Sequence, residues 1–177
     1  MAHGDGFLSG GRHRCSFEAP LLGRFMADEQ MWIAGEWVAS ANGETSEVIN
    51  PATGEVLATV PRATVKDVNR CVEASRSAFE HADWRAMDPA QRGRILNKMA
   101  AVTYAKAKEL AVIESSNNGK TFREALSEIR YGAWTLEYFA GLADKIEGTT
   151  IPVPGPRLNY TLRQPLGVTA HLSLIHI

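Results

Sequence analysis

"VINPATGEVLATVP", from Val48 to Pro61, is the stretch that decides how the first part of this chain folds. Two runs rich in β-branched residues flank a turn, in which Pro51 pre-sets φ and Gly54 can take the positive φ that closes it. The pattern predicts a β-hairpin. A second hairpin is predicted just before it in "MWIAGEWV" (residues 31–38), which alternates around a central Ala-Gly pair.

Three amphipathic helices are predicted after the hairpins, each from a start signal in the sequence. Thr64 with Asp67, and Thr121 with Glu124, have the spacing of a capping box, in which the N-cap side chain and the side chain three residues later bond each other's backbone N–H groups. The middle helix is predicted to start with Asp88 as its N-cap and Pro89 at the first helical position. The middle helix is expected to continue to Gly119, because glycine can end a helix in the left-handed conformation.

Apolar residues recur every three or four positions in each predicted helix, and we expect these sides to be buried. They consist of Val68, Cys71, Val72, Ser75, Ala78 and Phe79 in the first helix, Ile95, Met99, Val102, Leu110 and Ile113 in the second, and Leu126, Ile129, Ala133, Leu136 and Ala140 in the third. Cys71 is therefore interpreted as a small core residue and not as a nucleophile. The third helix also carries four aromatic residues that suit a core or a pocket wall, and we assign them to the core: Tyr131, Trp134, Tyr138 and Phe139.

The chain after Gly148 changes to a period of two, which is typical of strands. Prolines at 152, 154 and 156 predict a turn and an edge strand, because proline cannot donate to a central ladder. The following "LNYTLRQ" (residues 158–164) is predicted to be an extended strand.

The composition is that of one ordinary globular domain, with 177 residues, 45% hydrophobic and 22% charged. A net charge of -1 gives no electrostatic reason to expect nucleic acid or a membrane as partner. No apolar run approaches the roughly 18 residues of a membrane span. Two cysteines cannot form a disulfide framework, so we expect a cytoplasmic setting. The common catalytic and phosphate-binding motifs are absent, and the carboxylates beside Lys or Arg, as in "EIR", are interpreted as solvated helix faces.

Six segments occur in the order seen in the aldehyde dehydrogenase superfamily, which the chain resembles from about Trp32 to His171. They are "MWIAGEWV", "INPATGEVLATVP", "DWRAMDPAQRGRILNKMA", "SNNGKTFREAL", "EYFAGLADKIEG" and "YTLRQPLGV". The resemblance implies an α/β fold, as the incomplete N-terminal portion of a cofactor-binding domain: two β-hairpins and three helices. Residues 26–148 would belong to the NAD(P)-binding domain, and residues 149–171 would start the β-arm used for oligomerisation.

The resemblance also implies an activity, the oxidation of a small aldehyde to a carboxylic acid with NAD or NADP through a cysteine thiohemiacetal and thioester. The nucleophilic cysteine, the glutamate base and the main cofactor contacts would all follow His171, so no catalytic or cofactor-binding residue is assigned and this chain is expected to be inactive. Tyr131 and Ser127 fall where the family's helix lines the aldehyde entrance tunnel, although ordinary helix packing explains them equally well. The family often binds a cation near Val48 and a carboxylate, but Asn117 stands in place of that carboxylate, and no metal is expected.

The whole enzyme would be a homodimer or homotetramer joined through the arm. A different interpretation makes the chain a stand-alone, non-catalytic module of helices and hairpins, which binds a partner protein by β-addition to the strand after Gly148. Two terminal segments are interpreted as foreign to the fold. Residues 1–25 are taken as a non-native or disordered extension, with translation starting at Met26 or Met31. Residues 172–177, "LSLIHI", match the translation of a sequencing adapter.

Overall fold

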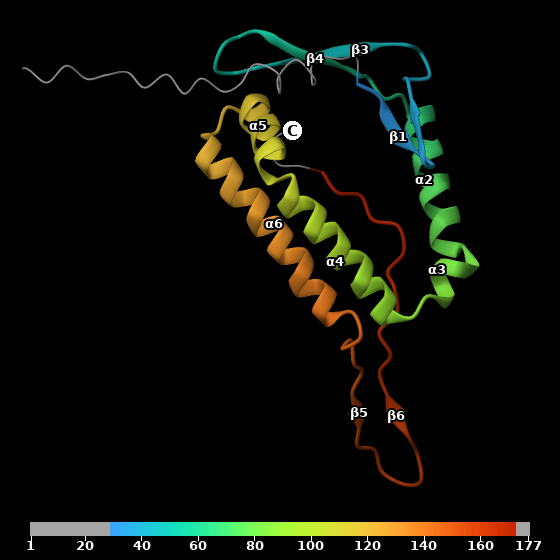
Figure 1. Cartoon of the computed structure of the whole chain (residues 1–177). Coiled ribbons are helices and arrows are strands. Elements are labelled where there is room, and N and C mark those ends of the chain that lie inside the picture. The colour runs from blue at the N-terminus through green and yellow to red at the C-terminus, as the bar shows by residue number, and fades with distance from the viewer. Residues whose placement is uncertain (1–28, 173–177) are drawn as a thin grey trace, which may run out of the picture.

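The computed structural model describes residues 29–172, and in this range two antiparallel hairpins are followed by five consecutive helices and then by a third antiparallel hairpin (Figure 1). The strands are β1 (Met31–Ile33), β2 (Glu36–Val38), β3 (Thr45–Ile49), β4 (Val56–Pro61), β5 (Thr150–Ile151) and β6 (Asn159–Tyr160). The helices are α2 (Val65–Glu80), α3 (Ala82–Ala86), α4 (Pro89–Ala105), α5 (Ala107–Asn118) and α6 (Phe122–Leu142). The interpretation of residues 1–25 lies outside the described residues, as does all of "LSLIHI" except Leu172.

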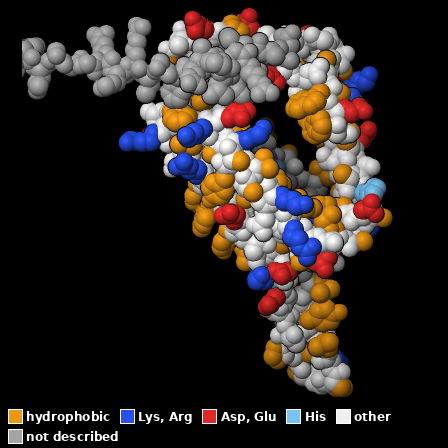
Figure 2. Space-filling view, in the orientation of Figure 1, with side chains coloured by type: hydrophobic (Ala, Val, Ile, Leu, Met, Phe, Trp, Pro, Cys, Tyr) orange, Lys and Arg blue, Asp and Glu red, His pale blue; other side chains and the backbone are white. Residues whose placement is uncertain are grey.

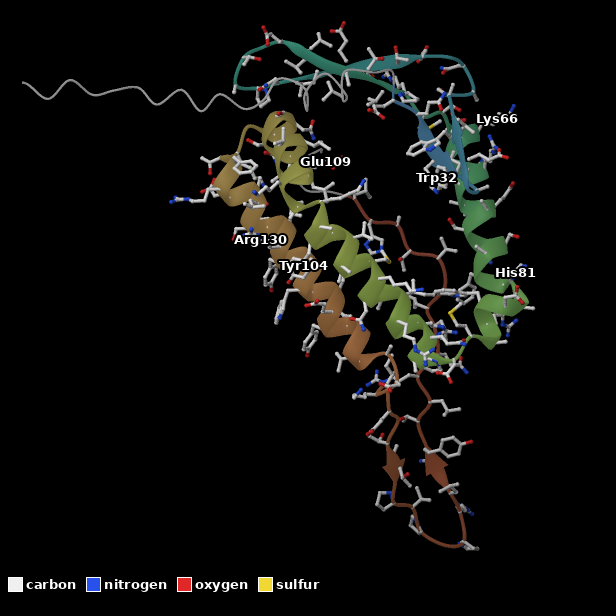
Figure 3. The ribbon with its side chains drawn as sticks, viewed as in Figure 1. Trp32, Lys66, His81, Tyr104, Glu109 and Arg130 are labelled. Atoms are coloured by element: carbon white, nitrogen blue, oxygen red, sulfur yellow. The ribbon has the colours of Figure 1, made fainter. Side chains whose placement is uncertain are left out.

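Both predicted N-terminal hairpins are confirmed. In β1–β2, Ala34 and Gly35 have φ values of 56° and 84°, which is the type I′ geometry that matches the twist of a two-residue hairpin. Trp32 lies opposite Trp37, and their rings meet edge to face with centroids 4.8 Å apart. Figure 3 shows Trp32 on this hairpin beside α2. In β3–β4 the turn closes with Gly54 at a φ of 75°, as predicted.

The predicted capping box of α2 is confirmed and does more than start the helix. The Asp67 backbone N–H donates to Thr64 Oγ1 at 3.4 Å, and the Thr64 N–H donates to Asp67 Oδ2 at 2.8 Å. The buried Asp67 carboxylate also accepts the Ala41 N–H, with both oxygens at 3.2 Å. One side chain therefore joins the start of α2 to the loop between the two hairpins.

The predicted middle helix is divided into α4 and α5, with Lys106 between them at φ −98° and ψ 9°. The hydrogen bonds continue across the bend, because the Lys106 N–H donates to the Val102 carbonyl and Leu110 donates to Lys106. No glycine or proline marks this position, and both segments pack against α6. Neither of these helix-breaking residues therefore accounts for the bend. The short α3, capped by the His81 ring nitrogen, was not predicted.

The face that α4 buries against α6 is not the predicted one. Gly93 and Ala100 are the buried residues of α4, and a Cβ on Gly93 would lie 2.7 Å from the Ala140 carbonyl oxygen of α6. Met99 and Val102, predicted to be buried, are 50% and 58% exposed. Small residues let the two helix axes approach closely, so the long apolar side chains point elsewhere. Ile95 of α4 and Ile113 of α5 are also exposed, whereas Leu110 of α5 is half-buried.

The predicted apolar stripe of α6 is confirmed, with Ala133 and Ala140 buried against α4 and α5 and the leucines and isoleucine of the stripe half-buried. The assignment of the four aromatic residues to a core is wrong in the described chain, where each is at least half exposed. Figure 2 shows hydrophobic side chains along the outer edge of this helix. Cys71 is also exposed, with its neighbour Val72, because no described element covers that side of α2.

The hairpin β5–β6 extends away from the helices as a narrow arm (Figure 1). Gly155, with a φ of 80°, lies in its tip. The strand predicted over residues 158–164 is shorter than expected, since only Asn159–Tyr160 is paired. The chain then returns in an extended form, and residues 167–169 line an open groove of about 770 Å³ together with α2 and α3.

Candidate functional site

The exposed aromatic face of α6 is the candidate site, because it contains both residues assigned to the tunnel. Ser127 and Tyr131 are both exposed and lie four positions apart, so they share one side of the helix. The ring of Tyr131, which is 67% exposed, lies 5.5 Å from that of Trp134, and Tyr138 follows at 6.0 Å. The result is a row of three neighbouring rings next to one hydroxyl, which suits contact with an apolar molecule or polypeptide.

The start of α6 is held by its cap residues. The Thr121 hydroxyl accepts the Glu124 N–H at 3.3 Å and donates to the Glu124 carboxylate at 2.9 Å. The predicted capping box is thus half present, because the carboxylate bonds the Thr121 hydroxyl and not its backbone N–H. Ser127 lies within the next two turns, so the cap fixes the helix just before the candidate site.

A charged cluster at the corner between α5 and α6 is the second feature that holds the first half of α6 in place. Lys120 Nζ lies 3.3 Å from Glu114 Oε1 and makes a shorter contact with Glu128 Oε2, while Asn118 donates to Glu114 Oε1 at 2.6 Å. The hydrogen bond that Lys120 donates to Glu128 raises the pKa of Lys120 above its ordinary value, and Glu114 adds to the effect. Because Glu128 follows Ser127 directly, the cluster anchors the first half of α6 to the end of α5.

Sequence reasoning missed this cluster, since it interpreted Glu128 in "EIR" as part of a solvated face. Its partner Lys120 lies eight residues earlier, beyond the N-cap, where helical spacing rules do not apply. The available signal was the lysine immediately before Thr121, because a long side chain at that position can extend over the first turns of the helix that follows.

The resemblance places the family's cation, which is not expected in this chain, near the same corner. Gly119, at a φ of 79°, approaches the β3–β4 turn so closely that a Cβ there would be 2.9 Å from Pro51 Cγ. Between residues 29 and 172 no three His, Cys, Asp or Glu side chains are grouped so that they could hold a metal ion. No helix in this range combines the length and hydrophobicity needed to cross a bilayer.

Comparison with known proteins agrees with the fold and the segment order. The sequence model of the family described as "Aldehyde dehydrogenase family" matches residues 37–173. The chain belongs to the aldehyde dehydrogenase family. It is 40% identical over 145 residues to a protein named "Putative aldehyde dehydrogenase DhaS" of Bacillus subtilis, a match that covers 81% of this chain and 29% of that protein. It is also 40% identical over 156 residues to "Aldehyde dehydrogenase, cytosolic 1" of Mus musculus, which covers 87% of this chain and 31% of the mouse protein.

The structural comparison extends this similarity to three dimensions. The structure of an NAD+ complex of aldehyde dehydrogenase from Bacillus cereus matches with a TM-score of 0.79 and 38% identity, over 83% of this chain and 30% of that one. The α/β fold predicted from the resemblance is therefore confirmed as part of the aldehyde dehydrogenase fold. The chain spans about three-tenths of the length of the relatives that it matches.

Proposed function

We infer that this chain is the N-terminal part of a longer aldehyde dehydrogenase, and that the whole enzyme oxidises an aldehyde to a carboxylic acid with NAD or NADP. The observation that carries this inference is the family match over residues 37–173. The Bacillus cereus relative is an NAD+ complex, which favours NAD for the whole enzyme. One aldehyde, one water and one NAD(P)+ would yield one acid, one NAD(P)H and one proton.

We propose that the described residues do not themselves form a dinucleotide site. The N-termini of α2, α4 and α6 are already capped by Thr64, Asp88 and Thr121, and each has an acidic residue either at the cap or three positions after it. A phosphate would meet negative charge at all three helix starts. We therefore place the cofactor contacts, the nucleophilic cysteine and the glutamate base in the remaining seven-tenths or so of the enzyme, which this chain does not match. The nicotinamide would accept a hydride there.

The part that this chain contributes to the reaction would be a wall of the aldehyde entrance. Ser127 and Tyr131 are proposed as wall residues because they are exposed on one side of α6 and because the cap at Thr121 and the Lys120 cluster hold that half of the helix. The neighbouring ring of Trp134 extends the apolar surface. Their effect would be on which aldehyde enters, and not on the chemical step.

The domain division follows from the same inference. Residues 26–148 would form the first part of the cofactor-binding domain, and residues 149–171 would begin the arm that joins two or four copies of the enzyme. The exposed and narrow β5–β6 hairpin supports this role for the arm. A cytoplasmic location is proposed as well, in keeping with the name of the cytosolic mouse relative.

Two measurements test the proposal. Purified 1–177, incubated with NAD+ or NADP+ and with acetaldehyde or benzaldehyde, is expected to form no reduced cofactor, as followed by absorbance. Aldehyde-dependent turnover above a protein-free control would contradict the proposed position of the catalytic residues. A chimera in which residues 37–171 replace the matched segment of the Bacillus cereus enzyme is expected to regain NADH formation.

The chimera also tests the wall residues. Tyr131→Ala is expected to change the KM for benzaldehyde by about tenfold, the low end of what a lost side-chain contact changes, and to leave the KM for NAD+ unaltered. Trp37→Ala is the matched control, because it removes an equally exposed aromatic ring from the first hairpin. Equal effects of the two variants would show that Tyr131 does not line the aldehyde path.

A further inference from the structure

Among the described residues, side-chain packing gives the β5–β6 arm little support. From Gly148 to Leu162 every residue is exposed except Val153, which is half-buried. Even its apolar side chains are open to solvent, as Ile151 and Tyr160 show. A hairpin with two paired residues in each strand does not set its own direction relative to the helices. The direction of the arm must therefore be set where it leaves the helices.

Thr149 and Thr161 make three hydrogen bonds to each other at this point. The Thr161 N–H donates to the Thr149 carbonyl oxygen at 2.9 Å, and the Thr149 N–H donates to Thr161 Oγ1 at 2.9 Å. The two hydroxyl oxygens lie 3.0 Å apart and share a third bond. This pair is the step of the ladder before Thr150 and Tyr160, so it closes the hairpin at its base.

Gly148 fits against this pair because it has no side chain. A Cβ built on Gly148 would overlap the carbonyl oxygen of Thr161 and lie 2.9 Å from its carbonyl carbon. The obstacle is backbone, which cannot rotate away as a side chain can. Gly148 is not among the glycines with positive φ, so the requirement for glycine comes from this close approach and not from backbone conformation.

The short connection from α6 is fixed as well. The Lys145 N–H donates to the Leu142 carbonyl oxygen at 2.9 Å, and Lys145 Nζ donates to the Gly141 carbonyl oxygen at 2.7 Å. These bonds continue the end of α6 to within three residues of Gly148. Only Ile146 and Glu147 separate the fixed helix end from the fixed base of the hairpin.

We propose that Gly148, Thr149 and Thr161 form a neck that holds the arm in one direction relative to α6. Any side chain at position 148 pushes Thr161 away from Thr149, opens the base of the hairpin and redirects the arm. The neck acts in this chain by itself and does not depend on the proposed enzymatic activity.

Pulsed electron paramagnetic resonance can measure the direction of the arm. Spin labels are attached at Glu137→Cys on α6 and Arg157→Cys near the arm tip, both exposed positions, in a chain with Cys15→Ser and Cys71→Ser. The unaltered neck is expected to give one narrow distance distribution. Gly148→Ala is expected to shift and broaden it, while Gly141→Ala, a nearby glycine with no atom within 4 Å of a built Cβ, leaves it unchanged.

A second variant keeps the test decisive if Gly148→Ala fails to fold, which a loss of helix content would reveal. Thr161→Val preserves the shape of the side chain and removes the two hydrogen bonds made by the Thr161 hydroxyl, while the backbone bond to Thr149 remains. This variant is expected to broaden the distance distribution without moving its mean. A broad distribution with the unaltered neck would overturn the proposal. So would distributions for Gly148→Ala and Thr161→Val that superimpose on that of the unaltered neck.

Discussion

Replacing Gly93 with alanine is expected to destabilise the chain, although the same change inside a helix usually stabilises it by about 1 kcal/mol. The reason lies in the packing of α4 on α6. The new Cβ would lie 2.7 Å from the Ala140 carbonyl oxygen, whereas ordinary contact begins at 3.4 Å. Because the obstacle is the backbone of a packed helix, α4 and α6 must move apart.

The size of the effect follows from two opposing contributions. Overpacking of this kind costs about 1–3 kcal/mol, and the higher helix propensity of alanine offsets about 1 kcal/mol of it. The free energy of unfolding should therefore fall by about 0–2 kcal/mol. Gly132→Ala in the middle of α6 is the matched control, because no atom lies within 4 Å of its built Cβ, and it should raise the free energy of unfolding by about 1 kcal/mol.

The assay is urea unfolding followed by circular dichroism of the helices. With a slope of about 2 kcal/mol per molar urea, the urea midpoints of the two variants should differ by about 0.5–1.5 M. The midpoint of Gly132→Ala should lie above that of the wild-type chain, and the midpoint of Gly93→Ala should lie below it or, at the lower limit, equal it. The reasoning is refuted if Gly93→Ala raises the midpoint as much as Gly132→Ala does. That result would mean that α4 and α6 are not in close contact at Gly93.

Two further predictions concern pH. Hydrogen bonds from Thr64, backbone first, hold the pKa of Asp67 below its ordinary value, so its contribution to stability is complete above about pH 3.9 and is lost as pH falls through the lower folded pKa. Asp67→Asn should lower the urea midpoint at pH 7, and this deficit should shrink in acid; a deficit independent of pH would contradict the assignment. The pKa of Lys120 is raised, chiefly by the hydrogen bond to Glu128, so its contribution is complete below about pH 10.4 and is lost as pH rises through the higher folded pKa. Lys120→Met should be less stable than the wild-type chain at pH 8, and the two stabilities should converge only in strong alkali. If Lys120→Met is as stable as the wild-type chain at pH 8, the cluster contributes nothing to stability.

Features that depend only on residues close together in the sequence were predictable from it. The turn at Gly54 and the caps at Thr64 and Asp88 are local, because one residue type satisfies a nearby backbone requirement. Hydrophobic periodicity was a poorer guide to burial. It identified Met99 as a core residue, whereas the backbone of α4 approaches α6 through Gly93, and a period alone does not tell which side a partner helix selects.

The candidate site was less predictable, because part of it depends on contacts between segments that are distant in the sequence. Its helix and the spacing of Ser127 and Tyr131 are local, but the exposure of the aromatic residues depends on which parts of the protein cover α6. The link between Lys120 and Glu128 joins residues on either side of a cap, and only the folded corner brings them together. Family resemblance, and not the chemistry of individual side chains, pointed to the enzyme class.

The edge-to-face pair of Trp32 and Trp37 makes the first hairpin visible to spectroscopy by itself. The electronic transitions of two indoles with centroids 4.8 Å apart are coupled, and this coupling is lost when the hairpin opens. The helical signal of the chain, in contrast, comes mainly from the longer helices, including α4 and α6. A single sample thus carries two optical reporters, and a urea titration read with both would tell whether the hairpin and the helical pair melt as one cooperative unit.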